Sequence, residues 1–179
     1  TPEGLTDRLE RRGYDLAVRH HARGVEAERF VAPKTSGVEI RPVIDLESLK
    51  GAVITADTVF GKTPDLSAIS LRKQLADLTS PNARVHRFVA YEKGQPVSVG
   101  GMTIYRDADL AFFWGGATLA ESRGRGHYAA VVKHRVEHAR ALGLRWVGLF
   151  ARHDTSSPIV EKMGFDTVGQ MLYYERAAA

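Results

Sequence analysis

A chain of 179 residues and 19.7 kDa has the length of one globular domain. Hydrophobic residues make up 44% of the sequence and charged residues 26%, a composition that excludes disordered and fibrous classes. The absence of cysteine excludes disulfide frameworks, thiolate metal sites and cysteine nucleophiles. No apolar run is long enough to span a membrane and no export leader is recognisable, so we expect a cytoplasmic domain with no membrane partner.

The charge balance is mildly basic, with 25 Lys and Arg against 21 Asp and Glu, a net charge of +4 and a pI near 9.5. The basic residues are scattered along the chain and form no stripe interleaved with aromatic residues, which disfavours nucleic acid as the partner. A modest positive field also suits a small polyanionic ligand.

Residues 1–36 are expected to form an N-terminal appendage to a domain over 37–179. Within it the pattern predicts a short helix over 5–12, an extended stretch over 14–20 and an irregular linker over 23–37. This helix–strand outline resembles the end of another small α/β unit. We therefore expect that an upstream region precedes the chain.

The first half of the main domain predicts an edge strand, two helices and a hairpin. Pro42 donates no ladder hydrogen bond, so its strand lies at a sheet edge or ends there. Asp45 is a helix cap, and Gly94 supplies the positive φ of the hairpin turn. The expected strands cover 38–43, 84–91 and 97–105, and the expected helices cover 45–49 and 66–78.

The second half alternates strands and helices. Gly143 and Gly164 are expected to end the two helices. The strand–helix–strand unit over 110–151 predicts a right-handed crossover between parallel neighbours. The fold class is therefore α/β (α+β), with a mixed, mostly antiparallel central sheet flanked by helices. The expected strands cover 110–119, 145–151 and 165–174, and the expected helices cover 126–142 and 155–163.

The most informative motif is Arg123-Gly124-Arg125-Gly126-His127-Tyr128, where a strand ends and an amphipathic helix begins. The glycines allow a tight turn and a close approach of a ligand to the backbone. The first-turn N–H groups and the helix dipole form an anion site, to which the arginines add positive charge. The sequence therefore predicts a cradle for a phosphate group; the alternative is a plain glycine loop with two solvated arginines.

A second feature is the pair Gly115-Gly116, which interrupts the preceding strand. Paired glycines inside a strand indicate a bulge or a close backbone approach. A bulge here would separate this strand from its parallel neighbour and open a slot at their carboxyl ends, where open α/β sheets bind ligands. The alternative is that the two glycines only pack against Trp146.

The phosphate motif, the amphipathic helix and strand after it, and the ending Glu161-Lys162-Met163-Gly164-Phe165 together resemble the GNAT superfamily of acyl-CoA-dependent N-acetyltransferases. The resemblance covers about residues 38–175. It implies a GNAT-like sheet with a splayed pair of parallel strands, and acetyl-CoA as the cosubstrate. No metal is implied.

By this resemblance, one strand would pair with the pantetheine arm and the following turn would hold the pyrophosphate. His153 stands where the family often has an asparagine that binds the arm, and Ser156 lies near it in sequence. The cofactor-binding residues implied are Ala117, Thr118, Leu119, Arg123, Gly124, Arg125, Gly126, His127, Tyr128, Ala129, His153 and Ser156.

Three positions depart from the family pattern: Tyr128 replaces a glycine or alanine, His153 replaces the asparagine, and Val160 replaces a tyrosine that protonates the leaving thiolate. Release of an unprotonated thiolate at pH 7 costs about 2 kcal/mol, which water or Ser157 can offset. A lysine-like amine lies about 4.6 kcal/mol from its free base at pH 7.

We assign no catalytic base, because Asp107, Asp109 and Glu121 are more typical of solvated loop charges. The preferred hypothesis is direct acetyl transfer from acetyl-CoA to the amine of a small molecule or peptide, with a strand N–H near Thr118 or Leu119 polarising the thioester. The alternative is a non-catalytic acyl-CoA-binding or regulatory domain, which Val160 favours. The acceptor is not identified by any motif, and exposed sheet edges allow a homodimer.

Two further motifs do not support a binding site. Gly61-Lys62-Thr63 lacks the preceding glycine of a nucleotide-binding phosphate loop. His134 and His138 lie one helical turn apart without a third ligand, and are expected to be surface residues.

Overall fold

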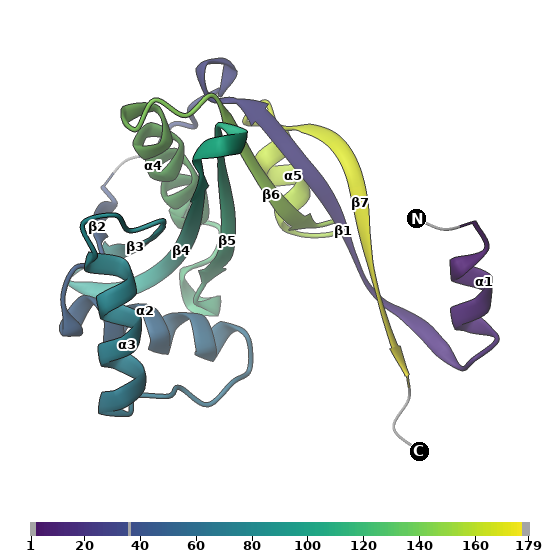
Figure 1. Cartoon of the computed structure of the whole chain (residues 1–179). Helices are drawn as coiled ribbons and strands as arrows, with labels where there is room; N and C mark the ends of the chain where they lie inside the picture. Colours follow the sequence, from purple (N-terminus) through teal and green to yellow (C-terminus); the bar gives the residue numbers. More distant parts are fainter. Residues whose placement is uncertain (1–2, 36, 177–179) are drawn as a thin grey trace.

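The computed structural model describes residues 3–35 and 37–176 and shows one mixed sheet with helices on both faces (Figure 1). The strands are β1 (Tyr14–Glu26), β2 (Glu39–Pro42), β3 (Val85–Glu92), β4 (Gln95–Tyr105), β5 (Leu110–Thr118), β6 (Trp146–Arg152) and β7 (Asp166–Arg176). The α-helices are α1 (Leu5–Glu10), α2 (Leu46–Val59), α3 (Ala68–Thr79), α4 (His127–Ala141) and α5 (Ser156–Glu161). Short 3₁₀ turns cover Ala27–Arg29, Arg106–Ala108 and Ala120–Ser122.

The seven strands lie in the order β2-β3-β4-β5-β6-β1-β7. Strands β2 to β5 pair antiparallel in chain order, and β5 pairs parallel with β6, to which the crossover helix α4 connects it. The predicted mixed sheet and its parallel pair are confirmed. Pro42 ends β2, and β2 is an edge strand, as its missing N–H requires.

Strand β1 departs from the expected appendage, because it lies inside the sheet between β6 and β7. It pairs antiparallel with both neighbours, placing His20 opposite Arg152 on one side and Met171 on the other. It runs to Glu26, although a linker was expected from residue 23. Residues before and after the boundary expected at residue 36 therefore pack in the same sheet. That an upstream region precedes the chain stays a prediction.

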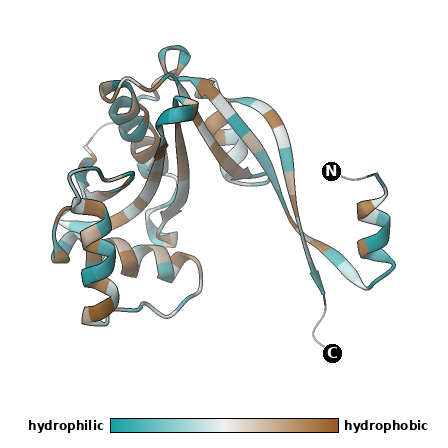
Figure 2. Ribbon diagram, in the orientation of Figure 1, coloured by the Kyte–Doolittle hydropathy of each residue, from teal (hydrophilic) through white to brown (hydrophobic). Residues whose placement is uncertain are grey.

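Beyond the end of β6, β1 and β7 continue as a two-stranded ribbon with α1 at its far end (Figure 1). In Figure 2 this ribbon carries both hydrophilic and hydrophobic residues. Within the described ranges, no helix is both long enough and apolar enough to cross a membrane.

Two apolar clusters fill the two faces of the central sheet. Helix α2 packs Leu49 and Val53 against Val99 of β4 on one face. Helix α4 packs Val132 and Val136 on the other face, in the same cluster as Val160 of α5. The sheet is thus buried on both sides, and its irregular central strands hold the candidate site.

Helix α2 begins as predicted and ends later than predicted. Asp45 accepts a hydrogen bond from the Ser48 N–H at 2.8 Å and completes a capping box. The helix continues through the stretch 51–55, whose glycine and β-branched residues have low helix propensity. Ala52 and Val53 are buried in it, so packing onto the sheet overrides local preference.

Candidate active site

The bulge predicted at Gly115-Gly116 is present in β5. One residue of β4, Gly100, lies opposite these two residues of β5. Gly115 has a φ of +59°, a conformation that glycine adopts without strain. Parallel pairing between β5 and β6 ends at Phe113 and Leu149, just before the bulge, so the two strands separate beyond it (Figure 1).

Arg135 of α4 lies directly beneath this bulge and is 1% exposed. Its Nη1 donates to the carbonyl oxygens of Gly101, at 2.9 Å, and Trp114, at 3.5 Å. The guanidinium lies 4.4 Å from the ring centroid of Phe113. Burial lowers the pKa of Arg135 from 12.5 to about 10, so the side chain still carries its charge at pH 7. The guanidinium is therefore hydrogen-bonded to both β4 and β5 at the point where their pairing register shifts.

Gly100 explains how such a long side chain fits below the sheet. A Cβ atom at this position would lie 2.8 Å from Cζ of Arg135 and 2.9 Å from Cγ1 of Val131. Only a glycine leaves the space that the guanidinium fills. Gly100, the bulge and Arg135 therefore form one structural unit.

A cavity of about 560 Å³ opens where β5 and β6 separate. Its wall combines the bulged strand, the start of α4, the end of β6 and the first turn of α5, together with the end of α2 and one residue of β1. The lining residues are His20, Val59, Phe60, Gly115, Gly116, Ala117, Thr118, Arg123, Tyr128, Phe150, Arg152, Thr155, Ser156 and Ile159.

The turn before α4 has the geometry of an anion site. Gly124 and Gly126 have φ values of +73° and +80°, as the tight turn requires. The first intrahelical hydrogen bond runs from the Ala130 N–H to the Gly126 carbonyl, so the N–H groups of His127, Tyr128 and Ala129 precede the helical ladder. In the described part of the chain, no side chain caps this helix start.

The two arginines of the motif have different surroundings. Arg123 lines the cavity, and its Nε donates to the Thr118 carbonyl at 3.2 Å. Arg125 forms an ion pair with Glu92 at 2.8 Å and donates to the carbonyl of Glu121. Arg123 therefore faces the cavity, whereas Arg125 braces the turn against the β3–β4 hairpin.

Tyr128 lines the cavity and separates it from a smaller space of about 60 Å³ that reaches toward Arg135. A Cβ atom at Gly116 would lie 2.8 Å from Cε2 of Tyr128, so the second bulge glycine makes room for this ring rather than for Trp146. Burial raises the pKa of the Tyr128 phenol, against the opposing effect of the Arg135 charge. The phenol is therefore protonated at neutral pH. Tyr128 forms part of the wall and leaves the larger space open.

The implied cofactor-binding residues divide into two groups. Ala117, Thr118, Arg123, Tyr128 and Ser156 line the cavity together. The remaining members do not line it: Leu119, Gly124, Arg125, Gly126, His127, Ala129 and His153.

His153 and Ser157 belong to a different cluster. The rings of His153 and His21 lie 5.0 Å apart, and Ser157 is 1% exposed. The Ser157 hydroxyl accepts from Arg23 Nε at 3.0 Å and lies 2.8 Å from Nδ1 of His21. Because these contacts hold the Ser157 hydroxyl against β1 and away from the cavity, it is not available as the proton source that the sequence suggested. Val160 is fully buried in the core.

The cavity wall contains two titratable residues that the sequence does not predict there, Arg152 of β6 and His20 of β1; of these, His20 can act as a base at neutral pH. The His20 ring stacks edge-on with the ring of Tyr173 at 5.3 Å. Burial is the main cause that lowers the pKa of His20; the charge of Arg152 lowers it further and the charge of Asp154 opposes the shift. No local motif marks this histidine. Its place depends on the pairing of β1 with β6, which no pattern in the sequence predicts.

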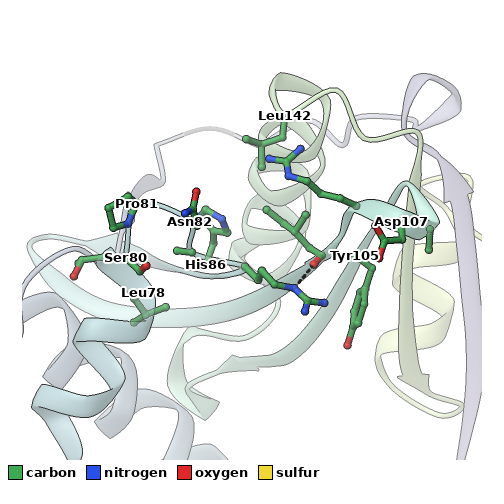
Figure 3. Close-up of a pocket in the computed structure, with 14 residues that line it drawn as sticks. Leu78, Ser80, Pro81, Asn82, His86, Tyr105, Asp107 and Leu142 are labelled. Atoms are coloured by element: carbon green, nitrogen blue, oxygen red, sulfur yellow. Dashed lines mark hydrogen bonds between the residues drawn. The ribbon is translucent and has the colours of Figure 1, made fainter.

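A second cavity of about 690 Å³ lies at the opposite ends of β3 and β4 (Figure 3). Its wall includes Asn82, Arg84 and His86, and Arg84 Nε donates to the Ile104 carbonyl at 3.1 Å. It contains neither the bulge nor the start of α4. This remote cavity is the larger of the two, but the motif residues line the β5–β6 cavity. The β5–β6 cavity is therefore the candidate site.

His134 and His138 were expected on the surface, but both are half-buried against β3. The ring of His134 lies 4.8 Å from that of Phe88, and the ring of His138 lies 4.8 Å from that of His86. Within residues 3–35 and 37–176, no group of three or more His, Cys, Asp or Glu side chains is arranged to hold a metal ion.

The family model described as "Acetyltransferase (GNAT) family" matches residues 57–165. This match covers more than half of the chain, and it contains the bulge, the turn before α4 and the β5–β6 pair. The chain therefore belongs to the GNAT acetyltransferase family. No curated protein matches the sequence.

Solved structures show the same fold. A GCN5-related N-acetyltransferase from Kribbella flavida has 19% identity and a TM-score of 0.68, over 99% of this chain and 65% of its own. One from Sphaerobacter thermophilus has 16% identity and a TM-score of 0.72, over 94% and 54%. A Clostridium acetobutylicum structure, described as a predicted acetyltransferase with acetyl-CoA, has 17% identity and a TM-score of 0.57, over 74% and 92%. The chain spans between 54% and 65% of the first three structures that it matches.

Proposed function

We propose that this protein transfers an acetyl group from acetyl-CoA to an amine by direct attack on the thioester. The observation that carries the proposal is the cavity at the β5 bulge, which lies beside the unbonded N–H groups at the start of α4. A thioester arm and a pyrophosphate need those two features next to each other.

The pyrophosphate would bind at the turn before α4. Backbone N–H groups there, together with the helix dipole, favour a negative charge. Hydrogen bonds to a charged group contribute about 1.5–3 kcal/mol each. Arg123 adds a positive charge on the cavity side of the turn.

The thioester carbonyl would be polarised by β5. The Leu119 N–H already donates to the Val97 carbonyl of β4 at 3.0 Å. Because N–H groups alternate in direction along a strand, the Thr118 N–H faces away from β4, toward the cavity. Of the two candidate donors, Thr118 is thus the one that supports stabilisation of an oxyanion.

The leaving thiolate meets no proton donor at Val160, since that side chain is buried in the core. Tyr128 offers a phenol in the cavity wall that is protonated at neutral pH and can donate a hydrogen bond to the sulfur. The step needs little help, because an unprotonated thiolate costs about 2 kcal/mol at pH 7.

Thiol release tests this function. The protein is incubated with acetyl-CoA and a panel of amines, and free coenzyme A is measured with a thiol reagent, with acetylated product identified by mass spectrometry. Amine-dependent thiol release is the expected result. Binding of acetyl-CoA without release on any amine would instead support a non-catalytic acyl-CoA-binding domain, the alternative that Val160 favours.

A further inference from the structure

We propose that His20 is the general base that accepts the proton of the acceptor amine. This inference rests on the proposed function and adds the group that the sequence analysis leaves unassigned. His20 is the histidine in the cavity wall, where it faces the same space as Gly116, Ala117 and Thr118 of the bulged strand.

The surroundings of His20 hold its imidazole in the neutral form that a base requires. Nδ1 is buried and has no hydrogen-bond partner among the described residues. The positive charge of Arg152 disfavours protonation of His20, whereas the negative charge of Asp154 favours it. Burial and Arg152 together lower the pKa below 6.5, so the ring is unprotonated at pH 7.

The carboxylates considered from the sequence do not line this cavity. Asp107 lines the second, remote cavity instead. None of the described residues in the wall of the β5–β6 cavity carries a carboxylate, and its charged members are Arg123 and Arg152. A proton acceptor within reach of the thioester therefore comes from β1.

In the reaction, the amine nitrogen forms a bond to the thioester carbonyl carbon while His20 takes a proton from that nitrogen. The C–S bond then breaks, and its electron pair leaves with sulfur as the coenzyme A thiolate. The proton on His20 returns to solvent or to the thiolate, so the products are a neutral amide and free thiol.

The variant His20→Gln tests the proposal, with His86→Gln as the matched control. His86 is also a part-buried histidine whose pKa is lowered mainly by burial, but it lines the remote cavity. General-base removal is expected to lower kcat by about 100-fold. The control variant is expected to keep kcat, and both variants are expected to bind coenzyme A within about twofold of the parent.

The pH profile separates a catalytic role from a structural one. In the parent, kcat/KM should rise through an ionisation below pH 6.5, and this limb should disappear in His20→Gln. His20→Asn serves as a second variant if the glutamine form does not fold. A kcat within about threefold of the parent, with the acidic limb intact, would overturn the base assignment alone. Absence of turnover in the parent on every amine would overturn the proposed function as well.

A second inference follows from the apolar part of the same wall. We infer that the acceptor is a monoamine on an aromatic or branched aliphatic group. Phe60, Phe150 and Ile159 line the cavity with 51%, 43% and 41% of their surface exposed, which leaves apolar area for a ligand to cover. Among the described residues, no carboxylate lines this wall to bind the further ammonium groups of a polycation.

Paired amines test this preference, again on the basis of the proposed function. Phenethylamine and spermidine are compared as acceptors at equal concentration, with His86→Gln as a second active enzyme. We expect kcat/KM for phenethylamine to exceed that for spermidine by at least about tenfold. Phe60→Ser should reduce that ratio. Equal values, or a preference for spermidine, would overturn the assignment while leaving acetyl transfer itself intact.

Discussion

Replacing Arg135 with methionine removes a buried positive charge from beneath the β5 bulge and keeps a long side chain in its place. Burial lowers the pKa from 12.5 to about 10, so the folded protein bears a cost of about 3 kcal/mol for the charge. The substitution relieves this cost.

The same substitution removes favourable contacts. The Gly101 carbonyl loses a charged donor at 2.9 Å, worth about 1.5–3 kcal/mol. The cation–π contact with Phe113 at 4.4 Å adds up to about 2 kcal/mol when it is desolvated. The two sides nearly cancel, so we expect Arg135→Met to change the free energy of unfolding by less than about 2 kcal/mol.

Arg135→Ala is the matched comparison, because it removes the same charge and also leaves an unfilled cavity. We expect it to lower the free energy of unfolding by at least about 4 kcal/mol. Both values come from urea denaturation followed by circular dichroism. Coenzyme A affinity, measured by calorimetry, should fall by roughly tenfold in Arg135→Met, because the bulge loses one positioned hydrogen bond. A methionine variant as unstable as the alanine variant would refute the reasoning, since the buried charge would then be strongly stabilising.

Two further predictions concern stability. Burial lowers the pKa values of His86 and His138 below 6.5, so the unfolded chain binds protons that the folded chain does not, and the free energy of unfolding should fall as pH drops from 7 to 5. The double variant His86→Phe, His138→Leu should flatten this slope in denaturation series, and an unchanged slope would contradict the assignment. Asp45→Ala should lower the free energy of unfolding by about 1–2 kcal/mol through loss of the α2 cap, whereas Asp45→Asn should retain most of it; equal losses in thermal melts would count against capping.

The sequence predicts much of the fold because its signals are local. Gly94, Gly143 and Gly164 all adopt positive φ where a turn or a helix end was expected. The bulge at Gly115-Gly116 was also predictable, because paired glycines within a strand indicate a bulge or a close backbone approach.

The features that the sequence does not predict depend on contacts between distant residues. The pairing of β1 with β6 brings His20 and Arg152 together, and no pattern within the strand specifies that partner. From the sequence, Arg135 occupies a polar position of an amphipathic helix. Its side chain is nevertheless buried, because Gly100 leaves space for it. For the same reason the sequence identifies no catalytic base, since its only candidates are loop carboxylates.

A titration with coenzyme A tests the proposed site most directly, because a cavity of similar size that is remote from the bulge is also lined by arginines. Calorimetry would compare the parent with Arg123→Glu in the β5–β6 cavity and Arg84→Glu in the remote cavity. The proposed site predicts that Arg123→Glu weakens binding by at least about tenfold and that Arg84→Glu leaves it unchanged. No heat from the parent protein, or a loss confined to Arg84→Glu, would contradict it.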